Sequence, residues 1–245
     1  KKRLDKSAAK WFVNNSGAVA SANARFYAFA FFFLCTFIMG GGSRDDIQSL
    51  LLLRPLAVLF VAYSLAVSVR GQWVERLFPV YMLVAFAIVM VMQLVPLPPS
   101  IWANLPQREI YFEIGALAGI EQPWRPLSLS PSKTLNSLFS LFVPLAAMLL
   151  YLNLERADHR KALAVILAMA CLSAVLAMLQ LGGSANSPLY LYQITNNGQA
   201  VGLFANRNHQ AVLLACAIVI AAWYAGTIGR SEKASTIKVS VALGS

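Results

Sequence analysis

Four adjacent polar residues, Asn206-Arg207-Asn208-His209, are the strongest candidates for chemistry in this sequence. They precede a long apolar run, so we expect them at the N-terminal end of a membrane helix. Backbone N–H groups and the positive end of the helix dipole favour an anion at such a position. The Arg207 guanidinium can add a forked contact to phosphate oxygens, and His209 can move a proton near neutral pH. The segment therefore fits a site for a phosphorylated ligand.

The same four residues also have a purely structural interpretation. Asn206 or Asn208 can cap the helix, and the long Arg207 side chain can reach from the helix to the membrane interface. His209 is then a hydrated residue at the membrane boundary. These four residues alone leave both interpretations open.

Two weaker groups lie nearer the N-terminus. Arg44 and Asp46, with Asp45 between them, follow the first apolar run. Adjacent carboxylates at a membrane face can orient an acceptor hydroxyl or bind a divalent ion. No third ligand is close in sequence, so we predict no metal, and a solvated loop with its own counter-ion is the simpler interpretation. Arg54 follows four leucines, where a charge is costly unless it faces a cavity or reaches the headgroups.

The composition indicates whether water or lipid surrounds most of the chain. Hydrophobic residues make up 58% of the chain and charged residues only 12%, and the mean hydropathy is +0.63. A soluble domain carries about a quarter charged residues, so the surplus of apolar side chains indicates lipid as the solvent. The net charge of +10 is scattered between apolar runs. A nucleic-acid partner is therefore not expected, because such proteins gather their basic residues on one face.

Seven apolar runs predict an all-α polytopic membrane protein with about seven transmembrane helices. A basic segment over 1–25 precedes a helical membrane domain over 26–245, in which 99–133 and 182–208 form long outer loops. The chain begins without Met and ends within an apolar stretch, so we expect it to be the N-terminal part of a longer protein. The expected spans are 26–39, 50–69, 77–98, 134–154, 161–181, 209–228 and 237–245 onward.

The distribution of Lys and Arg predicts a cytoplasmic N-terminus. Short loops rich in these residues stay on the cytoplasmic side of a membrane. With the N-terminus inside, 14 of the 20 basic residues fall in inner segments, and the bias holds from loop to loop. The remaining six lie in outer segments or at span edges: Arg44, Arg54, Arg108, Arg125, Lys133 and Arg207.

The first long outer loop contains its own helix signal. Pro106 followed by Glu109 is typical of a helix start, after which Ile110, Ile114 and Leu117 fall on one face. We expect this helix to lie along the outer membrane interface, and an irregular loop with interfacial tryptophans is the alternative.

Several segments resemble one known family. Residues 202–211, Gly-Leu-Phe-Ala-Asn-Arg-Asn-His-Gln-Ala, are similar to the segment G-x-F-x-N-R-N-H-x-A of the O-antigen ligase and polymerase superfamily. Residues 93–99 with Trp102 resemble the end of an early span of that family, and 126–131 with Thr134 resemble the start of its next span. Residues 41–44 through Arg54-Pro55 resemble its first outer loop. The likeness covers about residues 40–220 in the family's order.

The resemblance implies a multi-pass glycosyltransferase of the bacterial inner membrane, with its active site facing the periplasm and no cofactor. It implies transfer of a glycan from an undecaprenyl-pyrophosphate carrier to a saccharide or to lipid A core, by either a ligase or a polymerase. Arg207 and His209 are then the catalytic candidates, and the substrate-binding candidates are Arg54, Asn206, Asn208, Arg44 and Asp46. Because the family's large periplasmic loop lies further downstream, the resemblance also implies that this part alone is inactive.

Two other classes of protein remain open. A flippase or transporter for lipid-linked sugars would share the hydrophobicity and the basic outer site, although all ten acidic residues lie outside the apolar runs. Ion-coupled transporters usually place ionisable groups at mid-membrane. A non-catalytic assembly partner is the second alternative, in which the polar clusters serve only as caps and interface anchors.

Overall fold

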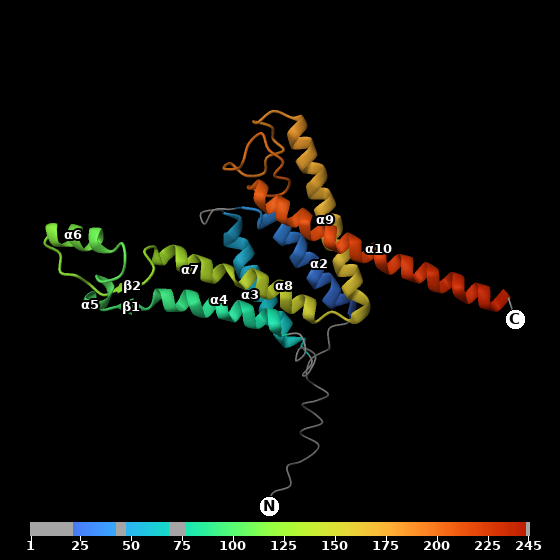
Figure 1. Ribbon diagram of the computed structural model, residues 1–245, viewed down its shortest axis with the longest axis horizontal. Coiled ribbons are helices and arrows are strands. Elements are labelled where there is room, and N and C mark those ends of the chain that lie inside the picture. The colour runs from blue at the N-terminus through green and yellow to red at the C-terminus, as the bar shows by residue number, and fades with distance from the viewer. Residues whose placement is uncertain (1–21, 43–47, 69–76, 244–245) are drawn as a thin grey trace, which may run out of the picture. The chain divides into compact units, whose positions relative to one another are not determined.

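The computed structural model describes residues 22–42, 48–68 and 77–243, with side chains described up to Thr227. The chain divides into two compact units. The first combines Lys1–Leu53 with Leu154–Ser245, and the second is Arg54–Asn153. Both consist mainly of helices (Figure 1).

The first unit is built around one long helix, α9. It contains α2 (Ala22–Met39), the first residues of α3 (Ser49–Ala66), α9 (Arg156–Gly182) and α10 (Arg207–Leu243). Helix α9 packs against both α2 and α10.

The core of this unit combines large and small side chains. Phe29 and Phe32 of α2 are buried, as are Ala162 and Ala170 of α9. Small residues on α9 let the neighbouring helices approach closely, which is a common way to pack helices inside membranes.

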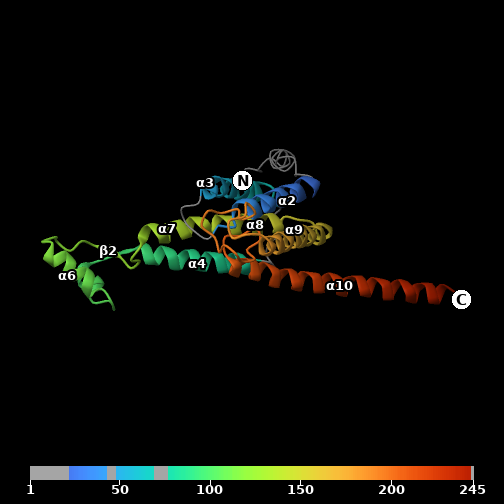
Figure 2. The same cartoon turned by 90° about the horizontal axis from the view of Figure 1, so that it is seen from above.

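The second unit contains a helical hairpin. Its tip, residues 95–130, connects α4 to α7. Helix α4 packs against α7 and α8, and two short strands pair antiparallel where the hairpin ends, with Leu97 opposite Arg125. Figure 2 shows α4 and α7 side by side, with α6 beyond their ends. Besides the rest of α3, its elements are α4 (Phe78–Leu94), β1 (Pro96–Leu97), α5 (Pro99–Trp102), α6 (Glu109–Leu117), β2 (Arg125–Pro126), α7 (Pro131–Ser140) and α8 (Phe142–Leu152).

Prolines decide where two of these helices stop. Val95 precedes Pro96, and a residue before proline is disfavoured in helical conformation, so α4 ends at Leu94. Pro144 has no N–H to donate to the Ser140 carbonyl, and the helix is interrupted at Leu141, between α7 and α8.

The apolar surface of these helices identifies an α-helical membrane protein. Helix α4 has no buried side chain, and Phe78 and Met92 are more than 60% exposed. In the described ranges, five helices are long and apolar enough to cross a membrane, and α4 is a shorter apolar helix. Exposed apolar surface of this extent needs lipid around it. The five are Ala22–Met39, Ser49–Ala66, Pro131–Leu152, Arg156–Gly182 and Arg207–Thr227.

The expected count of about seven transmembrane helices is therefore not found among the described residues. The expected span 77–98 is only 17 residues long as a helix. The expected seventh span is part of α10, which continues through 229–236, where the sequence predicts a connection. That stretch contains no proline and includes Glu232, Lys233 and Ala234, which favour helix, so no break is enforced.

The helix expected in the first long loop is confirmed, while the placement of both long loops on the outer side of the membrane stays a prediction. The helix expected from Glu109 exists as α6, and Ile110, Ile114 and Leu117 are all exposed. Residues 183–206 connect α9 to α10 without regular helix or strand. The cytoplasmic orientation of the N-terminus stays a prediction, and most of the basic segment 1–25 lies outside the described residues.

Two hydrogen bonds to backbone carbonyls shape the tip of the hairpin. The Trp102 indole Nε1 donates to the Pro126 carbonyl at 2.9 Å, and Trp102 is only 4% exposed. The Ser128 amide donates to the carbonyl of Gln93, near the end of α4, at 2.9 Å. The first bond closes the tip on itself, and the second holds it against the end of α4.

Replacing Trp102 with phenylalanine should loosen the tip. Trp102→Phe keeps an aromatic ring but removes the hydrogen bond to Pro126, which costs about 1 kcal/mol. Hydrogen exchange across residues 125–130 should then be about fivefold faster. Trp124→Phe is the matched control because Trp124 is 66% exposed. Equal exchange rates in the two variants would show that this bond does not hold the tip.

Candidate functional site

A polar stripe on α9 organises the loop that leads to Arg207. Ser173 and Gln180 are fully buried, and Ala170 and Ala177 lie on the same face of the helix. Polar side chains inside a membrane helix are costly unless they bond to protein groups. Both residues bond to the connection between α9 and α10, which lies beside the ends of these two helices (Figure 1).

The Gln180 amide uses its full bonding capacity on this loop. Its Nε2 donates to the carbonyls of Leu189 and Gly202, both at 3.0 Å. Its Oε1 accepts from the amides of Val201 and Gly202, at 3.1 and 2.8 Å. One side chain thus satisfies four backbone groups that have no helix or strand partner, and it fixes the path of the loop.

Ser173 joins this loop to α10. Its hydroxyl donates to Gln210 Oε1 at 2.6 Å and accepts from the Leu203 amide at 3.0 Å. Gln210 lies in the first turn of α10 and is only 2% exposed. The α9 stripe therefore sets the position of the start of α10 as well as the loop.

Gly202 makes the close approach possible. Its φ is +58°, a region that residues with a side chain rarely adopt. A Cβ at this position would lie 2.4 Å from Ser173 Oγ and 2.5 Å from Gln210 Oε1. Only glycine fits between these two side chains.

The connection that follows α2 meets the same segment. The Ala205 amide donates to the Gly41 carbonyl at 2.8 Å. A Cβ on Gly41 would lie 2.2 Å from the Leu203 carbonyl oxygen and 2.8 Å from the Tyr192 hydroxyl. Gly41, the first residue of one segment selected by the sequence analysis, is therefore in contact with another, 202–211.

The Tyr192 phenol belongs to this packed region. Burial raises its pKa above the ordinary value of 10.0, and the Gly41 backbone opposes part of that shift. The phenol therefore stays protonated across the neutral pH range.

The start of α10 has no free backbone donor. The Arg207 amide donates to Asn196 Oδ1 at 3.1 Å, and the Asn208 amide donates to Asn206 Oδ1 at 2.8 Å. The amides of His209 and Gln210 both donate to the Asn206 carbonyl. Asn206 is thus the helix cap, as the structural interpretation predicts, and an anion would have to bind through side chains.

The side chains of Arg207, Asn208 and His209 are exposed. No hydrogen bond or ion pair within the described ranges engages the Arg207 guanidinium. The His209 ring packs edge-on against Phe204 with 6.2 Å between ring centroids. The exposed guanidinium and imidazole are therefore attached to a backbone that is held by Asn196, by the Asn206 cap and by the Gly41 carbonyl.

The remaining site candidates belong to the second unit or lie outside the described residues. Arg54 belongs to the second unit, where one guanidinium nitrogen donates to Ser140 Oγ at 3.0 Å. Ser140 Oγ in turn donates to the Asn136 carbonyl at 2.9 Å, so this charge in an apolar helix has a polar partner. Arg44 and Asp46 lie outside the described residues. Among the residues described, no three His, Cys, Asp or Glu side chains lie close enough to hold a metal ion.

No protein-family model, curated protein or solved structure matches this chain. The likeness to the O-antigen ligase and polymerase superfamily therefore stays a prediction, and so do the roles that it implies for individual residues.

The sequence analysis missed Gln180, Ser173 and Gln210, which hold the candidate site in place. A signal was present for two of them, because Ser173 and Gln180 are polar, lie inside the expected span 161–181 and are seven residues apart. That spacing places both side chains on one helix face. Polar residues within a membrane span indicate a specific partner.

Replacing Gly202 with alanine should disrupt this site. Gly202→Ala combines a positive φ with overlap against Ser173 and Gln210, and we expect a loss of about 3 kcal/mol or more. The measurement is thermal unfolding of the purified protein, together with the rate of protease cleavage between residues 183 and 206. Gly182→Ala is the control, since a Cβ there meets nothing within 4 Å. The packing argument fails if both variants melt together and are cut at the same rate.

Proposed function

We propose that this protein transfers a glycan from an undecaprenyl-pyrophosphate carrier to a saccharide or lipid acceptor, with Arg207 at the reacting phosphate. The observation that carries the proposal is the exposed Arg207 guanidinium. It projects from a helix start whose backbone donors are all occupied, on a loop that Gln180 fixes. The likeness of residues 202–211 to the O-antigen ligase and polymerase superfamily supports the same reaction.

The reaction needs help with a leaving group and with a proton. The acceptor hydroxyl oxygen forms a bond to the anomeric carbon, and the bond from that carbon to the carrier pyrophosphate oxygen breaks. The pyrophosphate leaves with the bonding electron pair, so negative charge develops on it. A guanidinium placed beforehand stabilises this charge, and a general base takes the hydroxyl proton.

Arg207 and His209 have the chemistry for these two tasks. The planar guanidinium of Arg207 can donate two parallel hydrogen bonds to phosphate oxygens, a fixed geometry that a lysine ammonium lacks. His209 is two residues further along the first turn of α10 and is exposed, so its ring can accept a proton from a bound hydroxyl. We assign the pyrophosphate contact to Arg207 and the proton transfer to His209. The bacterial inner membrane, with the site facing the periplasm, is the location that this donor implies.

The direct test is glycan transfer in membranes by the full-length protein. The donor is an undecaprenyl-pyrophosphate-linked oligosaccharide, and the acceptor is either lipid A core or a second lipid-linked unit. A product with lipid A core indicates a ligase, and lengthening of the second unit indicates a polymerase. Donor binding without product on either acceptor would favour a flippase or an assembly partner instead.

Removing the Arg207 charge should abolish most of the transfer. Arg207→Ala should lower the rate about a hundredfold or more, the usual cost of deleting one transition-state donor. Lys133→Ala is the control because Lys133 is an exposed cation that belongs to the second unit. Transfer at an undiminished rate by Arg207→Ala, at matched expression, would exclude the assigned role.

His209→Gln should separate proton transfer from binding. Glutamine keeps hydrogen-bonding capacity but cannot take the acceptor proton, so kcat should fall about a hundredfold while donor binding is unchanged. The measurements are initial transfer rates and retention of the labelled donor. A rise in KM with an unchanged kcat would assign His209 to binding rather than to proton transfer.

A further inference from the structure

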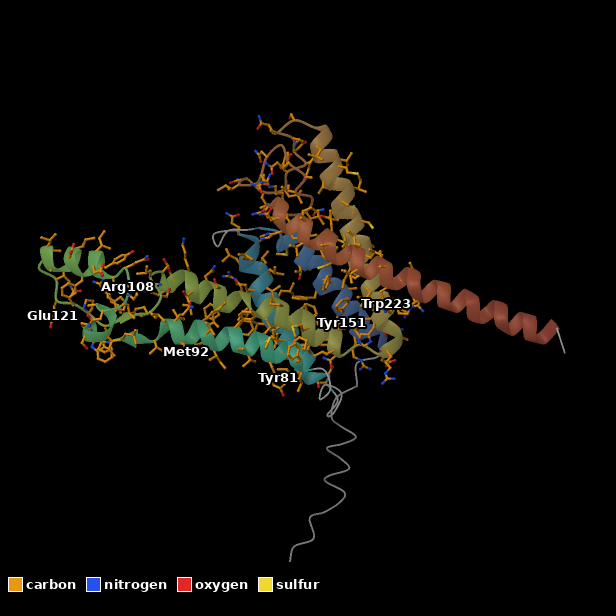
Figure 3. The ribbon with its side chains drawn as sticks, in the orientation of Figure 1. Tyr81, Met92, Arg108, Glu121, Tyr151 and Trp223 are labelled. Carbon is orange, nitrogen blue, oxygen red and sulfur yellow. The ribbon has the colours of Figure 1, made fainter. Side chains whose placement is uncertain are left out.

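The tip of the hairpin in the second unit gathers two cations around one indole ring. The Arg108 guanidinium carbon lies 5.1 Å from the centroid of the Trp102 ring, and that of Arg125 lies 5.0 Å from it. Tyr111 packs edge-on against the same ring at 6.2 Å. Figure 3 labels Arg108 and shows it in the tip segment that carries α6. An aromatic face attracts each cation, but two guanidinium groups on one ring also repel each other.

Arg108 is the buried member of this pair. A turn from Leu105 through Pro106 and Gln107, with a φ of +63° at Gln107, directs the chain back toward Trp102. Arg108 is only 9% exposed, and one terminal nitrogen donates to the Leu127 carbonyl at 2.6 Å. Its Nε and Nη1 are buried and have no hydrogen-bond partner in the described part of the chain. Arg108 therefore contributes a buried positive charge next to the Trp102 ring.

Arg125 is the accessible member. Its residue is half-buried, and no hydrogen bond or ion pair joins its guanidinium to another described residue. The glutamates of the tip, Glu109, Glu113 and Glu121, are exposed and form no ion pair with either arginine. Neither arginine on the ring is thus paired with a carboxylate of the described residues, and Arg125 is free to bind an anion such as a phosphate group.

The surroundings of Arg125 suit a lipid better than a free anion. Trp124 precedes Arg125 and is 66% exposed, and Ile114 and Leu117 of α6 are also exposed. The hydrogen bond from Ser128 to Gln93 ties the tip to the end of the apolar helix α4. Exposed tryptophan and an apolar helix face beside the end of a membrane helix are typical of the lipid headgroup region.

An apolar groove continues along the same helix pair. It has a volume of about 330 Å³ and is lined by Leu83, Val84 and Ala87 of α4 and by residues of α7 and α8 that include Phe139 and Phe142. Ala87 is seven residues before the end of α4, which is roughly 10 Å along a helix. One leaflet of the hydrocarbon core is about 15 Å deep, so an acyl chain can span from the tip to this groove.

We propose that the α4–α7 hairpin binds one anionic glycerophospholipid, with its phosphate on Arg125 and an acyl chain in the groove beside Ala87. Trp102 orients the Arg125 guanidinium, and Arg108 adds the second positive charge that favours a lipid with a net negative headgroup. This site lies within the second unit and is independent of the proposed glycan transfer, so each proposal stands or falls without the other.

The test is lipid retention by the purified full chain, measured by native mass spectrometry across a titration with phosphatidylglycerol. Arg125→Gln should weaken retention about tenfold, because it removes one charge-assisted contact. Ala87→Trp should weaken it as well without changing any charge, since the indole fills the groove. Lys133→Gln, which removes an exposed cation near the start of α7, should behave as wild type.

Several outcomes would overturn the proposal. Arg125→Gln retaining phosphatidylglycerol as well as Lys133→Gln removes the headgroup contact, and unchanged retention by Ala87→Trp removes the chain site. Wild-type protein that retains neutral diacylglycerol equally well has no phosphate site. Complete displacement of the lipid by inorganic pyrophosphate would assign Arg125 to a soluble anion. Arg125→Lys, which keeps the charge, should retain most of the binding and decides the matter if the glutamine variant does not fold.

Discussion

The side-chain amide of Gln180 anchors the connection between α9 and α10 at Leu189, Val201 and Gly202. This segment has no regular structure, yet it packs against helices that are apolar enough to lie in a membrane. Its backbone N–H and C=O groups need partners there, and each group left unpaired costs about 1–3 kcal/mol. Gln180 supplies four such bonds, and Ser173 supplies one more to Leu203. An irregular segment at this position therefore depends on polar side chains that a helix provides.

The same group of α9 side chains also fixes the backbone of the candidate site. Ser173 also bonds to Gln210 in the first turn of α10, so the loop and the helix start are held by neighbouring groups of α9. Asn196 and Asn206 then occupy the first amides of α10. The exposed Arg207 and His209 are consequently attached to a rigid backbone, which is the arrangement that a site for a developing charge requires. The capping function of Asn206 and a chemical function of Arg207 are therefore compatible, although the sequence analysis treated them as alternatives.

The second unit places three arginine side chains close to apolar residues, and each has a polar or aromatic partner. The Arg54 guanidinium in α3 donates a hydrogen bond to Ser140 Oγ. Those of Arg108 and Arg125 make cation–π contacts with the Trp102 ring. Neither arrangement uses a carboxylate among the described residues, although glutamates are present in the tip. A hydroxyl or an aromatic ring does not neutralise a guanidinium, so each of these charges can still pair with a phosphate group. The interruption between α7 and α8 at Leu141 lies beside the apolar groove, so the same hairpin offers both polar and apolar contacts.

The sequence by itself determined the class of the protein and most of its helices. A surplus of apolar residues is a property of composition, and the positions of α2, α3, α9 and α6 followed from apolar runs and from a proline near a helix start. It misjudged α10, because a short polar stretch without proline can continue a helix as readily as it can end one. Only the tertiary structure showed that Gly41 meets Ala205 and that Gln180 holds Gly202. Those contacts join residues that are far apart in the chain, and the hydrogen-bonding needs of a loop become visible only once the helix that meets them is in place.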